Sequence, residues 1–146
     1  MKTIRILLLP DESQMALMEM CITTYSSLLI QHVIEGRSDL IADVTSDFFC
    51  ASTQLQLWRD ICRRIQRFPK RHKLAQLYCR WGNDYQLTQD KVCLPLGAGS
   101  IINELNINCI YRTFQTKLLG AKHPATLTLK RIKGHWYAYL LVAEDK

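Results

Sequence analysis

The chain opens with a run of hydrophobic residues of the kind found in strands. Residues 2–9 (KTIRILLL) combine apolar and β-branched side chains, and Pro10 interrupts the run directly afterwards. This composition next to a breaker predicts a first β-strand. Arg5, inside this strand, is expected at an exposed or ligand-facing position.

A helical period begins directly after this strand. Asp11 is placed to cap a helix, and Gln14, three residues later, can reach back to complete a capping box. Apolar residues then recur at helical spacing at Met15, Met18, Ile22, Tyr25, Leu29 and Val33. The pattern predicts a long helix that ends at about Glu35, before Gly36, and buries this stripe in the core.

Two further helices are predicted before the pattern changes. A short one fits residues 39–50, and the other begins near Ser52 and ends before Pro69. The apolar positions of this third helix recur three or four residues apart, so we expect the following residues to face the core: Leu55, Trp58, Ile61, Cys62, Ile65 and Phe68. Its opposite side carries Gln56, Arg59, Arg63 and Arg67.

After residue 80 the pattern becomes that of short strands. Alternating or β-branched runs separated by Gly, Asn and Asp occupy residues 85–88, 92–96 and 107–110. Residues 125–132 and 135–142 flank Lys133-Gly134, which predicts a hairpin with a two-residue turn. The predicted fold class is α+β, in which the first strand joins the later strands in a small antiparallel β-barrel and the helices are inserted after it.

Charge changes this picture because it is unevenly distributed. Of the net charge of +6, residues 1–50 (three basic, seven acidic) contribute −4 and residues 51–146 (sixteen basic, six acidic) contribute +10. A strongly basic surface predicts a polyanionic partner, with nucleic acid favoured over an anionic membrane. Asp60 is the only acid among seven arginines and lysines between residues 59 and 73, whereas a solvated helix usually mixes its signs.

The basic residues fall into two groups. Arginines spaced four residues apart on the third helix rise by about one turn per step, which suits a phosphate backbone better than one small anion. The residues predicted to neutralise phosphates here are Arg59, Arg63, Arg64, Arg67, Lys70, Arg71 and Lys73. The second group, Lys130, Arg131 and Lys133, lies beside hairpin aromatics that either stack on bases or cover a core. A solvated basic helix remains the alternative interpretation.

Membrane, disulfide and metal signatures are missing from the sequence. No apolar run approaches the ~20 residues needed to cross a bilayer, and residues 4–9 are too short for a signal-peptide core, so a cytoplasmic location is expected. The six cysteines include no CxxC pair and lie on segments predicted to be buried. Free thiols are therefore favoured over disulfides or a zinc site, and no metal or other cofactor is predicted.

Residues arranged for catalysis are also hard to find. The four histidines are scattered and belong to no metal-binding or nucleophile motif. Asp39, Asp43 and Asp47 could hold Mg²⁺, but their spacing is more simply explained as the solvated side of a short helix. The sequence thus predicts a binding protein without a catalytic site. The alternatives are an interaction or regulatory protein that uses its acidic N-terminal helices, and a metal-dependent nuclease or transposase that acts alone.

With these segments in view, the chain resembles the transposon-encoded OrfB/TnpB proteins, relatives of the compact type V CRISPR effectors. That family opens with a strand ending in Leu-x-Pro-Thr, then Glu-Gln and a helix with a late Tyr or Asn, and the matching residues here are Leu8, Pro10, Gln14 and Tyr25. Asp11 replaces the Thr, and Ser13 replaces the Glu. Residues 52–54, 92–96 and 130–142 resemble the family's Ser-Gln helix start, Ile-x-Leu-Pro strand and Gly-Lys-Trp-Tyr hairpin.

The resemblance implies a domain organisation and a partner. Residues 1–10 and 81–146 would form a wedge-like β-barrel domain, and residues 11–80 an inserted helical recognition domain. The family grips guide RNA and target DNA, and the RNA supplies the choice of sequence. The family's RuvC-like nuclease motif, Gly-x-Asp-x-Gly, and its zinc-ribbon cysteines are missing here. The chain is therefore similar to the non-catalytic front part of a TnpB-like nuclease whose nuclease domain is separate or lost. It would be a fragment, a decayed gene product or an independent small protein.

Overall fold

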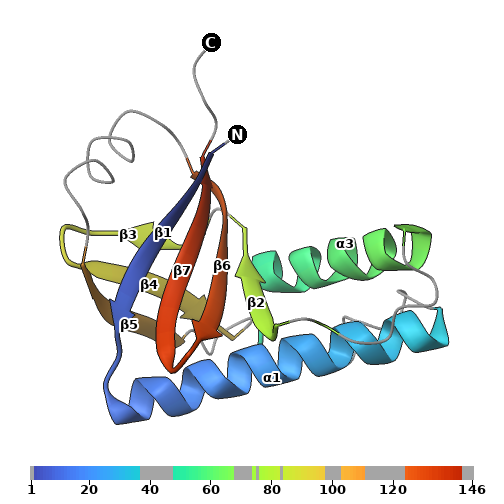
Figure 1. The fold of residues 1–146 in the computed structure, drawn as a ribbon, viewed down its shortest axis with the longest axis horizontal. Coiled ribbons are helices and arrows are strands. Elements are labelled where there is room, and N and C mark those ends of the chain that lie inside the picture. Colours follow the sequence, from blue (N-terminus) through green and yellow to red (C-terminus); the bar gives the residue numbers. More distant parts are fainter. Residues whose placement is uncertain are drawn as a thin grey trace.

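The computed structural model describes residues 2–36, 48–67, 74, 76–82, 84–97, 103–110 and 124–142. Within this part of the chain there are two helices and seven strands (Figure 1). The helices are α1 (Glu12–Glu35) and α3 (Ala51–Arg67). The strands are β1 (Lys2–Leu9), β2 (Tyr78–Trp81), β3 (Gln86–Leu87), β4 (Lys91–Leu96), β5 (Asn103–Ile110), β6 (Pro124–Ile132) and β7 (His135–Val142).

The strands form one antiparallel sheet in the order β2-β6-β7-β1-β5-β4-β3. Both helices lie between β1 and β2 in the sequence. The predicted α+β class, the antiparallel pairing and the helical insertion after the first strand are therefore confirmed. In Figure 1, β3, β4 and β5 run at a steep angle to β1, β6 and β7, as expected of a strongly twisted sheet.

The sheet is open, so the predicted barrel is wrong. Closure requires the two end strands, β2 and β3, to pair, and they do not pair within the described residues. α1 covers the free edge of β2 instead. Ser26 Oγ accepts a hydrogen bond from Tyr78 N (3.0 Å) and donates one to Tyr78 O (3.1 Å). Gly82 N donates to Ser52 Oγ of α3 (3.2 Å). The helices thus satisfy backbone groups that another strand would need.

α1 begins and ends where the sequence predicts. Asp11 Oδ1 accepts a hydrogen bond from Gln14 N (2.8 Å), and Gln14 Oε1 accepts one from Asp11 N (3.1 Å), which completes the capping box. Gly36 ends the helix with a φ of 67°, in the left-handed region. The predicted apolar stripe is buried except for Met15, which lies in the first turn of the helix and is 36% exposed.

The hairpin of β6 and β7 has the predicted turn. Lys133 (φ 52°) and Gly134 (φ 82°) both adopt left-handed backbone conformations, as a two-residue hairpin turn requires. The side chains of β7 alternate between two faces of the sheet. Those on the core face are Trp136, Ala138 and Leu140, and those on the opposite, outer face are His135, Tyr137, Tyr139 and Leu141.

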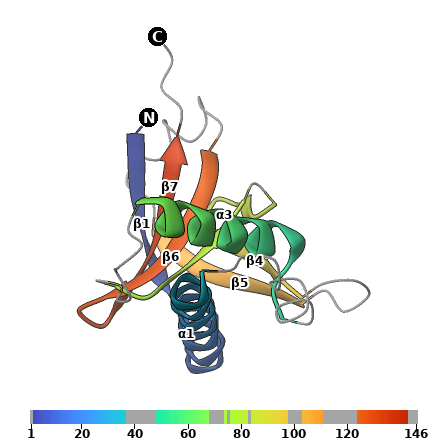
Figure 2. The ribbon, with the colours of Figure 1, turned by 90° about the vertical axis from the view of Figure 1, so that its right-hand side faces the viewer.

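The predicted core side of α3 is confirmed in part, since Ile61 is buried and Cys62 and Ile65 are half-buried, but the helix is rotated from the predicted orientation. Leu55 and Trp58, expected in the core, are each 45% exposed. The buried residues of the helix are Thr53, Gln56, Leu57, Asp60 and Ile61. The prediction failed because it placed Gln56 in solvent and gave Asp60 no partner, whereas polar contacts orient this helix. α3 contacts α1 and β2, and Figure 2 looks nearly along α1 and shows α3 crossing it.

Some predictions fall on other parts of the chain. Of the predicted second helix, residues 39–47 with the three spaced aspartates lie outside the described residues, and residues 48–50 form a turn rather than a helix. The proposed domain boundary between residues 80 and 81 falls inside β2.

The cysteines are free thiols as predicted, five of them buried and Cys62 half-buried. No helix in the described ranges has the length and apolar character to cross a membrane.

We predict that Ser26→Ala destabilises the protein by about 1–3 kcal/mol, because the buried hydroxyl leaves two backbone groups of β2 without their partner. Ser27→Ala, at the exposed neighbouring position on α1, provides the matched control and should change the free energy of unfolding by less than about 0.5 kcal/mol. Urea denaturation measures both. Equal effects of the two substitutions would contradict this role for Ser26.

Candidate functional site

A buried carboxylate joins α3 to the rest of the molecule. Asp60 is 4% exposed and accepts hydrogen bonds from two phenols, Tyr25 OH of α1 (2.6 Å) and Tyr78 OH of β2 (3.1 Å). Its other oxygen pairs with Arg80 Nη1 of β2 (2.6 Å). Both carboxylate oxygens therefore have partners, and the negative charge has a positive one, as a buried ion requires.

Burial and this charge keep the two phenols protonated. Burial raises the pKa of Tyr25 well above its ordinary value, and the negative charge of Asp60 raises it further. Burial and then Asp60 raise the pKa of Tyr78 to about 12. Both hydroxyls therefore remain hydrogen-bond donors to Asp60 throughout the neutral range.

Arg80 connects this network to the outer face of the sheet. Its Nε donates a hydrogen bond to Thr128 Oγ1 of β6 (3.1 Å) while its Nη1 holds Asp60. The guanidinium also lies over the ring of Tyr78, with Cζ 5.1 Å from the ring centroid. Three contacts thus fix the direction of this side chain, which remains 23% exposed.

The exposed side of Arg80 belongs to a cavity of about 400 Å³ between α3 and the outer face of the sheet. Its lining residues are Thr3, Gln56, Arg59, Arg63, Arg80, Thr126, Thr128, Lys130, Tyr139 and Leu141. Four of these are cations and none is acidic. We call this cavity the basic cleft, with Arg59 and Arg63 on its helical wall and Arg80 and Lys130 on its sheet wall.

Two of the four cations of the cleft, Arg80 and Lys130, are partly removed from water. Burial lowers the pKa of Lys130, and the nearby positive charge of Arg80 lowers it further. Lys130 Nζ lies 5.1 Å from the ring centroid of Tyr139. An anion in the cleft would relieve the repulsion between these cations, and the threonine hydroxyls offer further hydrogen bonds.

The structure brings together three of the residues predicted from the sequence: Arg59, Arg63 and Lys130. Arg64 is half-buried and Arg67 is exposed; both are on α3, and neither lines the cleft. Arg131 lies on the core side of the sheet, where it pairs with Glu19 of α1, and Lys133 occupies the hairpin turn. Lys70, Arg71 and Lys73 lie outside the described residues.

Neither Arg80 nor the buried role of Asp60 was predicted from the sequence. β2 is only four residues long, and its alternation of Tyr78 and Arg80 with Cys79 and Trp81 was too short to stand out as a strand. That alternation was the available signal, because it places Arg80 and Tyr78 on one face. Asp60 carried a signal as well, since it is the lone acid in a basic segment.

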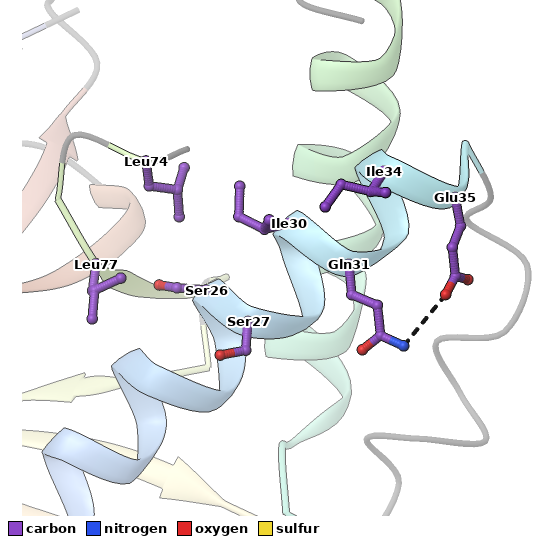
Figure 3. A pocket seen from close by; sticks show the side chains of 8 residues that line it. All are labelled: Ser26, Ser27, Ile30, Gln31, Ile34, Glu35, Leu74 and Leu77. Carbon is purple, nitrogen blue, oxygen red and sulfur yellow. Dashed lines mark hydrogen bonds between the residues drawn. The ribbon is translucent and has the colours of Figure 1, made fainter. Parts of the chain in front are cut away.

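A second cavity, of about 570 Å³, lies beside the C-terminal half of α1 (Figure 3). Its lining residues are Ser26, Ser27, Ile30, Gln31, Ile34, Glu35, Leu74 and Leu77. Gln31 Nε2 donates a hydrogen bond to Glu35 Oε1 (3.4 Å) at its rim. The lining is largely aliphatic and has a single ionisable group, so this cavity lacks the convergent charges of the basic cleft.

Comparisons with protein-family models and with curated proteins find no match for this sequence. The site is therefore interpreted from its own chemistry. Guanidinium, ammonium and hydroxyl donors around one cavity are groups that bind phosphate oxygens.

The raised phenol pKa values predict a loss of stability at alkaline pH. An unfolded tyrosine ionises near pH 10, whereas folded Tyr78 does so at about pH 12, so folding favours the protonated phenol. This contribution is fully present below pH 10 and is lost as the pH rises to 12, at up to about 1.4 kcal/mol per pH unit for each such tyrosine. Urea titrations between pH 8 and 12 measure it. Tyr78→Phe should make the decline shallower, and an unchanged decline would contradict the assignment.

Proposed function

We propose that this chain is a nucleic-acid-binding module and that the basic cleft binds the phosphate backbone. The observation that carries the proposal is the convergence of four cations, from α3, β2 and β6, on one cavity whose lining contains no acid. Phosphate contacts from arginine and lysine supply most of the affinity of proteins for nucleic acids, without by themselves selecting a sequence.

The spread of the cations favours a chain of phosphates over a single anion. Arg59 and Arg63 stand one helical turn apart, a rise of about 6 Å. Arg80 and Lys130 project from different strands of the sheet, and Lys130 pairs in register with Tyr78 rather than with Arg80. Positive groups distributed along the cleft match a ligand that carries its negative charges at intervals.

We further propose that the nucleic-acid partners are a guide RNA and a target DNA. The support for this proposal is the order of motifs that resembles the OrfB/TnpB proteins, together with helices placed between the first strand and an antiparallel sheet that ends in a hairpin. The bound RNA would then select the DNA sequence by base pairing. We assign no catalytic step to these residues and place the protein in the cytoplasm.

We predict that Arg59→Gln combined with Arg63→Gln weakens RNA binding and makes it less dependent on salt. The log of the binding constant should fall with the log of salt concentration by about 0.7 for each phosphate neutralised on a single strand, so losing two contacts should reduce the slope by about 1.4. Fluorescence anisotropy with a labelled single-stranded RNA at several salt concentrations measures this slope.

The control is Lys91→Glu, an exposed position on β4 outside the cleft. Both variants lower the net charge from +6 to +4, since one loses two positive charges and the other replaces a positive charge by a negative one. The proposal expects Lys91→Glu to keep the slope of the unmodified protein. If both variants reduce it equally, overall charge rather than the cleft drives binding. If the unmodified protein binds no RNA at low salt, the proposed function is wrong.

A further inference from the structure

Three aromatic rings line up on the outer face of the sheet. His135, Tyr137 and Tyr139 occupy alternate positions of β7, so their side chains share one face. The ring centroids of His135 and Tyr137 lie 6.5 Å apart, and those of Tyr137 and Tyr139 lie 6.3 Å apart. We call these three rings the aromatic ladder. Their spacing is close to the two-residue repeat of a strand, about 6.7 Å.

Cations flank the ladder on both neighbouring strands. Arg5 of β1 pairs in register with Tyr139, and its Cζ lies 4.7 Å from the ring centroid of the diagonal neighbour, Tyr137. Lys130 of β6 pairs in register with Tyr137, and its Nζ lies 5.1 Å from the ring centroid of Tyr139. Each tyrosine therefore has a cation over one face of its ring, and the two cations come from opposite sides of β7.

The ladder is not part of the core. The core face of β7 carries Trp136, which is 3% exposed and lies beside Arg131, the partner of Glu19 on α1. Strand alternation puts the ladder on the other face, where His135 is exposed and the two tyrosines are half-buried. Rings that fill a core would be expected on the face that α1 covers, so the ladder has surface available for a ligand.

Tyr139 links the ladder to the basic cleft, because it is the third ring of one and a lining residue of the other. We infer that the aromatic ladder stacks unpaired bases of a single strand whose phosphates lie in the basic cleft. This inference rests on the proposed function and specifies its ligand as single-stranded. Base faces in a duplex are already stacked on one another, whereas those of a single strand can stack on protein aromatics.

Substitution of the rings tests the inference. Tyr137→Leu combined with Tyr139→Leu should lower the affinity for a 12-nucleotide single-stranded RNA by about 25-fold or more, since each stacked base is worth at least about fivefold. The double variant Tyr137→Phe with Tyr139→Phe keeps both rings and should bind within about twofold of the unmodified protein. The salt slope should be unchanged in both variants, because neither removes a cation. The leucine pair should weaken binding of the corresponding 12-base-pair duplex, whose bases are already stacked, far less than binding of the single strand.

The outcomes separate this inference from the proposed function. Suppose the unmodified protein binds RNA in a salt-dependent way. If the leucine pair then weakens single-strand binding no more than the phenylalanine pair does, or weakens duplex binding equally, the stacking inference is wrong and the proposed role of the basic cleft stands. No binding of either RNA would overturn both.

Circular dichroism checks that the variants fold. If the leucine pair does not fold, the phenylalanine pair is tested instead, with the fluorescent base 2-aminopurine placed in the single-stranded RNA. Stacking on the rings predicts that the 2-aminopurine fluorescence is quenched on binding. Unquenched fluorescence in the complex would overturn the inference.

Discussion

The contact on which the rest of the structure depends is the buried carboxylate of Asp60. Moving a carboxylate out of water costs several kcal/mol, and here an ion pair and two phenolic hydrogen bonds offset that cost. These partners come from α1 and β2, so one side chain of α3 ties the helix to both. Because an α-helix turns about 100° per residue, Arg59 and Arg63 then lie on the same side of Asp60, about 100° and 60° around the helix. That side is the helical wall of the basic cleft.

The same contact gives Arg80 two roles. Its guanidinium neutralises Asp60 and binds Thr128, and its remaining surface lines the cleft. Of the four cations of the cleft, Arg80 and Lys130 are thus half-buried against the sheet, whereas Arg59 and Arg63 are exposed on α3. The pKa of Lys130 is lowered first by burial and then by the positive charge of Arg80. A polyanion that enters this cavity meets, at Arg80, a donor whose side chain is already held in place and needs little reorganisation, which favours binding.

The features that could be predicted from the sequence are those that depend on neighbouring residues. The capping box at Asp11, the left-handed Gly36 and the Lys133-Gly134 turn each follow from local backbone chemistry, and all three are present. The orientation of α3 could not be predicted in this way, because a hydrophobic period counts Leu55 and Trp58 as core and cannot see a polar network that joins three separate elements. The prediction of a closed barrel failed because it also depended on a contact between distant residues. Ser26 of α1 hydrogen-bonds to the edge of β2 that a further strand would need. For the site, the pattern of charges along the sequence predicted the arginines of α3. Arg80 could be placed in the cleft only once the pairing of β2 with β6 was known.

The most direct measurement is a double-mutant cycle of Asp60→Asn and Arg80→Gln, read as free energies of unfolding in urea. Each single variant leaves one partner of a buried pair uncompensated, so the account predicts a loss of about 3–5 kcal/mol for each. The combined variant should lose at least about 2 kcal/mol less than the sum of the two, because the second substitution removes a charge already stranded by the first. Effects that add to within about 0.5 kcal/mol would show that the pair is not coupled. That result would contradict the claim that Asp60 organises α3 and the cleft.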